Sequence, residues 1–242
     1  MTTRSIDESL EYLQAHGARV EYAPAFLSRP EADLWLERLR AEVVFEAPEA
    51  CRIRRPFSTE WVHIPRQMAA YGDPETCYVF SGARVRARPW IPELLELRER
   101  LAGWAQRSLN FVLIHRYRDG ADCMGWHADD ERDLGPEPEI LSLTLGAARD
   151  FQLRHRDAFP RAGRPAPRPE LETLSLRLAH GSLLAMRHPT NRDWKHQLPR
   201  RGGRRAHAVG ERWNLTWRTI ERRDAVDAGG GRARPFMLHP CT

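Results

Sequence analysis

Residues 212 to 218, Arg-Trp-Asn-Leu-Thr-Trp-Arg, alternate between polar and apolar side chains without a break. A period of two is that of a β-strand whose two faces meet different surroundings. Trp213, Leu215 and Trp217 are expected to pack into a core, so that the polar face lines a cavity. Two arginines on an enclosed face need anionic partners, which a dicarboxylate ligand supplies. The alternative is an edge strand with its polar face in water.

Further segments have the length and residue content of short β-strands. Their ranges are 111–117, 140–145, 151–153, 174–178 and 182–186. Between residues 51 and 90, short apolar pieces alternate with turn sequences, which is typical of hairpins. Helical spacing of apolar residues predicts amphipathic helices at 5–16, 29–43 and from Pro92 to Trp104. The expected fold class is mainly β with flanking α-helices.

The chain has 242 residues, of which 41% are hydrophobic and 29% charged, as in one globular domain. We expect residues 1–45 to form a helical extension packed on the core, 46–220 the main domain, and 221–242 a flexible basic tail. The sequence contains no apolar run of membrane-spanning length, and residues 1–12 lack the apolar core of a secretion signal. The expectation is a cytosolic monomer without a membrane partner.

The charge balance gives weak support for a polyanionic partner. The net charge is +5 and the isoelectric point is near 9.4. These values are compatible with a polyanionic partner such as nucleic acid, although composition alone does not establish one. The position of the charges is the more informative property.

A candidate metal site begins at His127 and Asp129, which stand two positions apart. On an extended strand both side chains project from one face, where they can bind one ion. Such a pair also occurs by chance. A distal histidine would complete the two-histidine, one-carboxylate set of non-haem Fe(II) oxygenases. His196 is the preferred third ligand, and His180 and His188 remain alternatives on spacing alone.

Several segments together resemble the AlkB family of dealkylating dioxygenases, in particular the animal homologues that repair duplex DNA. They are 127–132 (His-Ala-Asp-Asp-Glu-Arg), 143–151 (Leu-Thr-Leu-Gly-Ala-Ala-Arg-Asp-Phe), 180–184 (His-Gly-Ser-Leu-Leu), 194–196 (Trp-Lys-His) and 212–218. The resemblance spans roughly residues 45 to 220. It implies that 46–220 is a dioxygenase domain with a double-stranded β-helix, or jelly-roll, core. Fe(II) is the implied metal, with 2-oxoglutarate and O2 as cosubstrates.

The same resemblance implies roles for individual residues. The iron ligands would be His127, Asp129 and His196. Arg212 would bind the distal carboxylate of 2-oxoglutarate through the bidentate geometry that suits arginine. The contacts nearer the metal would be Asn214, Arg218 and Tyr117.

His115 is the one departure from the family pattern at the cosubstrate. The family usually has asparagine at this position, which touches 2-oxoglutarate. Histidine can also donate a hydrogen bond. We therefore expect an altered affinity for 2-oxoglutarate, with an inactive relative as the alternative.

The segment 77–82 resembles the strand that forms the family's base pocket. Because the enzyme must extrude a base from the duplex, aromatic stacking would offset the cost of extrusion. Tyr78 and Phe80 would surround the lesion, and Asp130 and Glu131 would read polar base edges. Without the resemblance, Tyr78 and Phe80 are ordinary core aromatics.

Candidate nucleic-acid contacts lie in two further places. Phe57 stands about one residue out of register with the apolar finger that duplex-acting relatives insert into the base stack. An arginine-rich loop lies between His196 and Arg212, where it can meet phosphates. The expected phosphate contacts in this loop are Arg200, Arg201, Arg204 and Arg205. Arg66, elsewhere in the chain, is a further candidate.

The predicted function is oxidative dealkylation of N-alkylated DNA bases, which is direct DNA repair. Examples of such bases are 1-methyladenine, 3-methylcytosine and etheno adducts. One alternative keeps the iron chemistry but acts on RNA, protein or a small molecule, because the fold hosts many substrates. Another is an inactive relative that binds nucleic acid.

Overall fold

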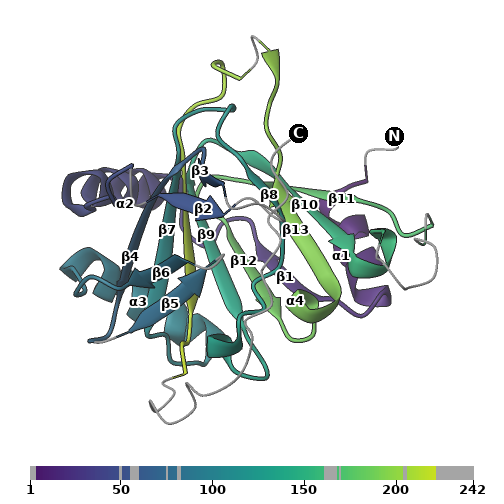
Figure 1. Ribbon diagram of the computed structural model, residues 1–242, viewed down its shortest axis with the longest axis horizontal. Helices are drawn as coiled ribbons and strands as arrows, with labels where there is room; N and C mark the ends of the chain where they lie inside the picture. The colour runs from purple at the N-terminus through teal and green to yellow at the C-terminus, as the bar shows by residue number, and fades with distance from the viewer. Residues whose placement is uncertain are drawn as a thin grey trace.

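The computed structural model describes residues 4–48, 51–54, 60–74, 76–80, 83–160, 168, 170–203 and 206–221. Two antiparallel sheets dominate it (Figure 1). In order across the larger sheet, the strands are β1 (Arg19–Ala23), β12 (Leu183–Arg187), β9 (Ile140–Gly146), β14 (Arg212–Arg218), β7 (Phe111–Tyr117) and β4 (Gln67–Gly72). The smaller sheet has the order β11 (Leu174–Leu178), β10 (Arg149–His155), β13 (Trp194–Leu198) and β8 (Met124–His127).

Two short ribbons complete the β-structure that the coordinates describe. They pair β2 (Arg52–Arg54) with β3 (Trp61–His63), and β5 (Cys77–Phe80) with β6 (Ala83–Arg86). One hydrophobic core joins residues of both large sheets, including Leu113 of β7, Leu184 of β12, Leu153 of β10 and Leu176 of β11. Two facing antiparallel sheets around a shared core make the jelly roll that the sequence predicted.

The three predicted helices are present as α1 (Ile6–Ala15), α2 (Arg29–Glu42) and α3 (Pro92–Ala105). The side chains of Ser5 and Ser28 cap α1 and α2 in capping boxes, which satisfies backbone N–H groups of the first turn. Short pieces follow the strands: η1 (Arg132–Leu134), η2 (Arg156–Ala158) and α4 (Thr190–Asp193). Figure 1 shows α2 and α3 on the outer side of the larger sheet.

Strand β14 has the two-faced environment that its alternation predicted. It pairs with β7 on one side and β9 on the other, so the edge-strand alternative is wrong. Trp213, Leu215 and Trp217 join an outer core that includes Leu36 of α2 and Leu97 of α3. The opposite face of β14 is therefore directed between the two sheets.

The N-terminal part differs from the helical extension that was expected, because it also contains strand β1. This strand pairs with β12 from Arg19 opposite Arg187 to Ala23 opposite Leu183, which makes it the edge of the larger sheet. A five-residue strand is too short for its periodicity to identify it in the sequence. Strand β1 forms because it pairs with residues 160 or more positions away in the chain. The predicted tail, apart from Glu221, lies outside the described residues.

None of the helices in the described ranges combines the length and apolar character needed to cross a membrane.

Candidate active site

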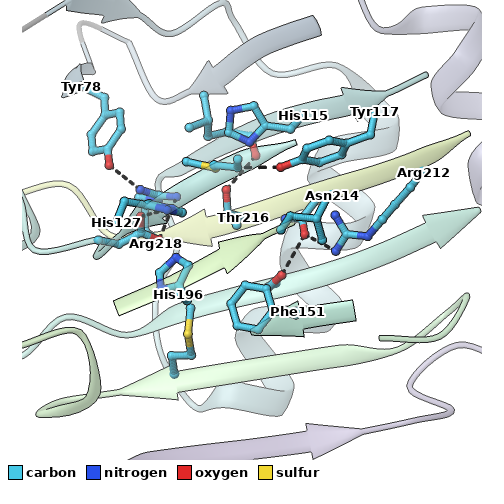
Figure 2. Close-up of a pocket in the computed structure, with 16 residues that line it drawn as sticks. Tyr78, His115, Tyr117, His127, Phe151, His196, Arg212, Asn214, Thr216 and Arg218 are labelled. Carbon is cyan, nitrogen blue, oxygen red and sulfur yellow. Dashed lines mark hydrogen bonds and ion pairs between the residues drawn. The ribbon is translucent and has the colours of Figure 1, made fainter. Parts of the chain in front are cut away.

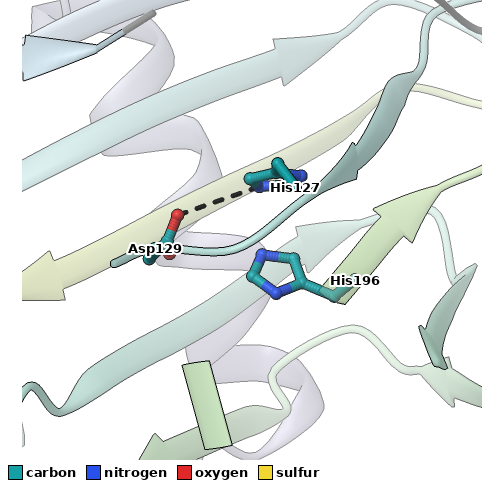
Figure 3. Close-up of side chains that lie close together, drawn as sticks. All are labelled: His127, Asp129 and His196. Carbon is teal, nitrogen blue, oxygen red and sulfur yellow. Dashed lines mark ion pairs between the residues drawn. The ribbon is translucent and has the colours of Figure 1, made fainter. Parts of the chain in front are cut away.

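Strands β8 and β13 bring the predicted metal ligands together. In their antiparallel register His127 stands opposite His196, and the two ring centroids are 4.1 Å apart. Asp129 follows β8, with its Oδ1 atom 3.8 Å from His127 Nε2 (Figure 3). One ligand atom from each of the three residues lies within 4.8 Å of the others. All three side chains are buried, so the geometry suits a single enclosed ion.

The protonation states favour metal binding. His127 Nδ1 donates a hydrogen bond to the carbonyl oxygen of Gly125 at 2.9 Å, which leaves Nε2 as the available ligand atom. Burial and the neighbouring His196 lower the pKa of His127 to about 3. Burial also lowers the pKa of His196. Burial alone would raise the pKa of Asp129, but the charges of Arg218 and the two histidines lower it. Two neutral imidazoles and one carboxylate are ligand-ready forms.

The alternative distal ligands are placed elsewhere. His180 accepts a hydrogen bond at Nδ1 from the Gly146 backbone N–H at 2.8 Å, and its Nε2 lies 3.0 Å from Asp33. His188 precedes a cis proline, Pro189, and does not join the histidine and carboxylate group. Spacing along the sequence left these histidines equivalent, and the pairing of β13 with β8 selects His196.

A cavity between the sheets joins this triad to the polar face of β14 (Figure 2). Arg212, Asn214, Thr216 and Arg218 line it from that strand. Arg212 is 1% exposed, and its Nη2 donates to Thr144 Oγ1 at 2.9 Å and to Asn214 Oδ1 at 2.6 Å. Burial lowers the pKa of Arg212 to about 10, so the guanidinium stays charged at neutral pH.

Several buried nitrogen atoms in this cavity remain available to form hydrogen bonds with a ligand. Arg212 Nε, Arg218 Nε and His115 Nε2 have no hydrogen-bond partner within the described part of the chain. Buried donors that lack partners are costly. Two guanidinium groups with free N–H bonds match the two carboxylates of a dicarboxylate, so the donor set fits 2-oxoglutarate. The metal triad at the same cavity fits Fe(II).

Two residues of β7, His115 and Tyr117, line the same cavity beside the polar face of β14. His115 stands opposite Asn214, and Tyr117 stands opposite Arg212, in the β14–β7 register. The Tyr117 ring centroid lies 5.5 Å from Arg212 Cζ. Burial, followed by the charge of Arg66, holds the pKa of His115 well below its ordinary value. His115 is therefore a neutral ring that offers one donor and one acceptor nitrogen, in place of the usual amide.

The four residues predicted for the base pocket have different environments in the structure. Tyr78 lines the cavity but is fully buried. Glu131 has both carboxylate oxygens buried; burial and the charge of Asp129 raise its pKa to about 8. Asp130 is exposed, forms an ion pair with Arg156 and does not line the cavity, and its role in reading a base edge stays a prediction. The side chain of Phe80 lies outside the described part of the chain.

The residues predicted to contact nucleic acid also differ in their exposure to solvent. Arg66 is 5% exposed and donates from Nη1 to the Cys123 carbonyl oxygen at 3.0 Å, so the prediction that it contacts a phosphate is wrong for this structure. Arg200 is exposed, whereas Arg201 forms an ion pair with Asp150. The remaining three lie outside the described residues: Phe57, Arg204 and Arg205.

Phe151 is a site residue to which the sequence analysis gave no role. Its ring lies 5.1 Å from the ring of His196, centroid to centroid, at an interplanar angle of 29°. This stacking holds the distal ligand in one orientation and lines the cavity with an apolar surface. Alternation along β10 places Phe151 and Leu153 on one face, but only the pairing of β10 with β13 brings that face to His196.

Comparisons with known proteins agree with this geometry. Residues 19–218 match the model of the 2OG-Fe(II) oxygenase superfamily. The human DNA oxidative demethylase ALKBH2 is 40% identical over 216 residues, which cover 89% of this chain and 78% of the human protein. The mouse protein of that name is 40% identical over 209 residues, covering 86% and 83% of the two chains. The rat alpha-ketoglutarate-dependent dioxygenase alkB homolog 3 is 34% identical over 211 residues, covering 84% and 64%.

Proposed function

Because the chain belongs to the 2OG-Fe(II) oxygenase superfamily, and within it to the AlkB homologues, we propose that it is a dioxygenase that repairs DNA by oxidative removal of alkyl groups from bases. The observation that carries this proposal is the cavity in which the buried triad of His127, Asp129 and His196 meets the arginine face of β14. The demethylase activity named for the mammalian relatives supplies the substrate class.

When bound, Fe(II) and 2-oxoglutarate would supply the oxidising chemistry, in which O2 and 2-oxoglutarate give succinate and CO2 and one oxygen atom of O2 enters an alkyl C–H bond. The protein positions the reactants and excludes water. His127, Asp129 and His196 would hold the iron. Arg212 would bind the distal carboxylate of 2-oxoglutarate, and Arg218 would bind its other carboxylate.

The polar wall of β7 and β14 orients the cosubstrate between these arginines. Asn214 Oδ1 accepts hydrogen bonds from Arg212 and from Ser142 Oγ, the latter at 3.1 Å. Its amide N–H groups are therefore left to donate to an oxygen of 2-oxoglutarate. His115 and Tyr117 line the same wall. Neutral His115 provides a donor where the family usually has an amide, so we expect a shifted affinity for 2-oxoglutarate and retained activity.

DNA would reach this cavity with the alkylated base extruded from the stack, at a cost of a few kcal/mol that is smaller for a lesion that cannot pair. Asp130 and Glu131, which follow the metal ligand Asp129 in the chain, keep their predicted roles at polar base edges as parts of the proposal. Exposed Arg200, in the loop between His196 and Arg212, is placed to meet a phosphate. Phe57, Phe80, Arg204 and Arg205 keep their predicted roles as parts of the proposal.

A mass-spectrometric assay on a panel of alkylated oligonucleotides tests the function. Single-stranded and duplex DNA carrying 1-methyladenine, 3-methylcytosine or an etheno adduct are each incubated with Fe(II), 2-oxoglutarate and O2, beside RNA with the same lesions. We expect loss of the alkyl mass from DNA, matched by succinate formation. Succinate formation without loss of any lesion would refute the proposal, and repair of RNA alone would support the RNA alternative.

The inactive alternative has a separate test. In an anaerobic titration of the Fe(II) protein, 2-oxoglutarate should produce a charge-transfer absorption band. The intact triad and the buried arginines favour this result over an inactive binding protein. A wild-type protein that binds iron but gives no band would favour the inactive relative.

A further inference from the structure

Tyr78 makes contacts that differ from those of a residue that stacks on a base. Its hydroxyl oxygen accepts a hydrogen bond from Arg218 Nη1 at 2.6 Å (Figure 2). Its ring centroid lies 4.8 Å from Arg218 Cζ and 5.3 Å from the ring centroid of Phe111. The residue is 0% exposed. Both the ring and the hydroxyl are therefore occupied by neighbours within the protein.

Arg218 lies between Tyr78 and the metal site. Its Nη2 atom is 3.7 Å from Asp129 Oδ2, on the other side of the guanidinium from the phenol contact at Nη1. In the β14–β7 register Arg218 also stands opposite Phe111, whose ring packs against Tyr78. Phe111 and Arg218 together fix the tyrosine ring. Tyr78 and Asp129 in turn fix the guanidinium.

This fixation is significant because an arginine side chain has many rotamers and loses considerable entropy when it is ordered. Asp129 is an anionic neighbour of the guanidinium at 3.7 Å, whereas burial raises the pKa of Tyr78 and keeps its phenol neutral. Asp129 is the carboxylate that forms an ion pair with this guanidinium, whereas Glu131 shares a side-chain hydrogen bond with Tyr78. A hydrogen bond to a neutral phenol restrains the guanidinium without neutralising it.

We propose that Tyr78 is a positioning residue for the cosubstrate rather than a base-stacking residue. Its hydroxyl holds Arg218 in the orientation that meets the 2-oxoglutarate carboxylate next to the metal. This inference rests on the proposed function, because it assumes that 2-oxoglutarate occupies the cavity. Without the hydroxyl, the guanidinium keeps its ion pair with Asp129 but loses its second restraint, so that 2-oxoglutarate binding must include the entropic cost of ordering it.

The test is an anaerobic titration of the Fe(II) protein with 2-oxoglutarate in the absence of DNA, followed by the charge-transfer band. Tyr78→Phe should weaken 2-oxoglutarate binding about tenfold, the range of one hydrogen bond to a charged group. Tyr71→Phe is the matched control. Tyr71 is 2% exposed and its hydroxyl accepts from the Val44 backbone N–H at 2.9 Å, in the outer core. This control should bind 2-oxoglutarate within about twofold of wild type.

Steady-state kinetics give a second readout. In Tyr78→Phe the KM for 2-oxoglutarate should rise while the KM for an alkylated oligonucleotide stays within about twofold of wild type. If 2-oxoglutarate affinity is the same in Tyr78→Phe as in Tyr71→Phe, the inference is overturned. A rise only in the oligonucleotide KM would return Tyr78 to the base pocket. A wild-type protein without a band would instead refute the proposed function.

A second pair of variants covers the case in which Tyr78→Phe does not fold. Tyr78→Gln keeps an oxygen acceptor for Arg218, and Tyr78→Met has a similar size without one. Thermal melting identifies the folded variants before titration. Tighter 2-oxoglutarate binding by Tyr78→Gln than by Tyr78→Met supports positioning through the hydrogen bond, and equal affinity of the two refutes it.

Discussion

Replacing Arg212 with methionine should separate ligand binding from protein stability. The guanidinium is 1% exposed, its Nε lacks a hydrogen-bond partner among the described residues, and its Nη2 contacts two neutral oxygen acceptors, on Thr144 and Asn214. Among the described residues, none of the carboxylates forms an ion pair with Arg212. Arg212 is therefore arranged for an anion that comes from outside the protein.

The expected magnitude follows from these contacts. A hydrogen bond to a charged group contributes about 1.5–3 kcal/mol, so losing a two-pronged contact with a carboxylate should cost about 3 kcal/mol. This corresponds to a roughly hundredfold rise in the KM for 2-oxoglutarate. The free energy of unfolding of the ligand-free protein should change by less than about 1 kcal/mol, because methionine removes a buried charge that lacks an ionic partner.

Arg149→Met is the matched control. Arg149 is also 1% exposed, but it donates to the carbonyl oxygens of Asp119, Asp122 and Pro199 at 2.8–3.0 Å. Its loss strands three buried acceptors, so the free energy of unfolding should fall by at least about 3 kcal/mol. The KM for 2-oxoglutarate should stay within about threefold of wild type.

Succinate formation against 2-oxoglutarate concentration measures the first quantity, and urea denaturation of the metal-free variants measures the second. The two arginine variants should show opposite patterns. An unchanged KM for 2-oxoglutarate in Arg212→Met, or an equal rise of that KM in both variants, would contradict the assigned role of Arg212.

Three further predictions concern the metal, pH and DNA. Asp129→Ala should remove the charge-transfer band, measured anaerobically; a normal band would exclude Asp129 as a ligand. Burial lowers the pKa of His127 from 6.5 to about 3, so the stability of the metal-free protein should fall by about 1.4 kcal/mol per pH unit below 6.5 from this group alone. Urea denaturation of His127→Gln should show a shallower fall, and an equal slope would contradict the assignment. Arg200→Ala should reduce the slope of log affinity against log salt by about 0.9 if one phosphate contact is lost, and Arg29→Ala at the start of α2 should not.

The sequence by itself determined the features that depend on local periodicity. The alternation from Arg212 to Arg218 specified a two-faced strand, and the one-residue gap between His127 and Asp129 placed both on one side of an extended chain. The helical spacing of apolar residues specified α1 and α2. The family motifs added the β-helix core and the cosubstrate. Each of these rests on residues a few positions apart, whose relative orientation is set by backbone geometry.

Only the tertiary structure decided which faces meet, because strand pairing and sheet packing bring together residues far apart in sequence. The β13–β8 register selected His196 over His180 and His188. Tertiary packing buried Arg66, which had been predicted to contact a phosphate. Burial likewise turned Tyr78 toward Arg218. An arginine or a tyrosine can lie on a surface or in a pocket, and its role depends on partners that the local sequence does not contain.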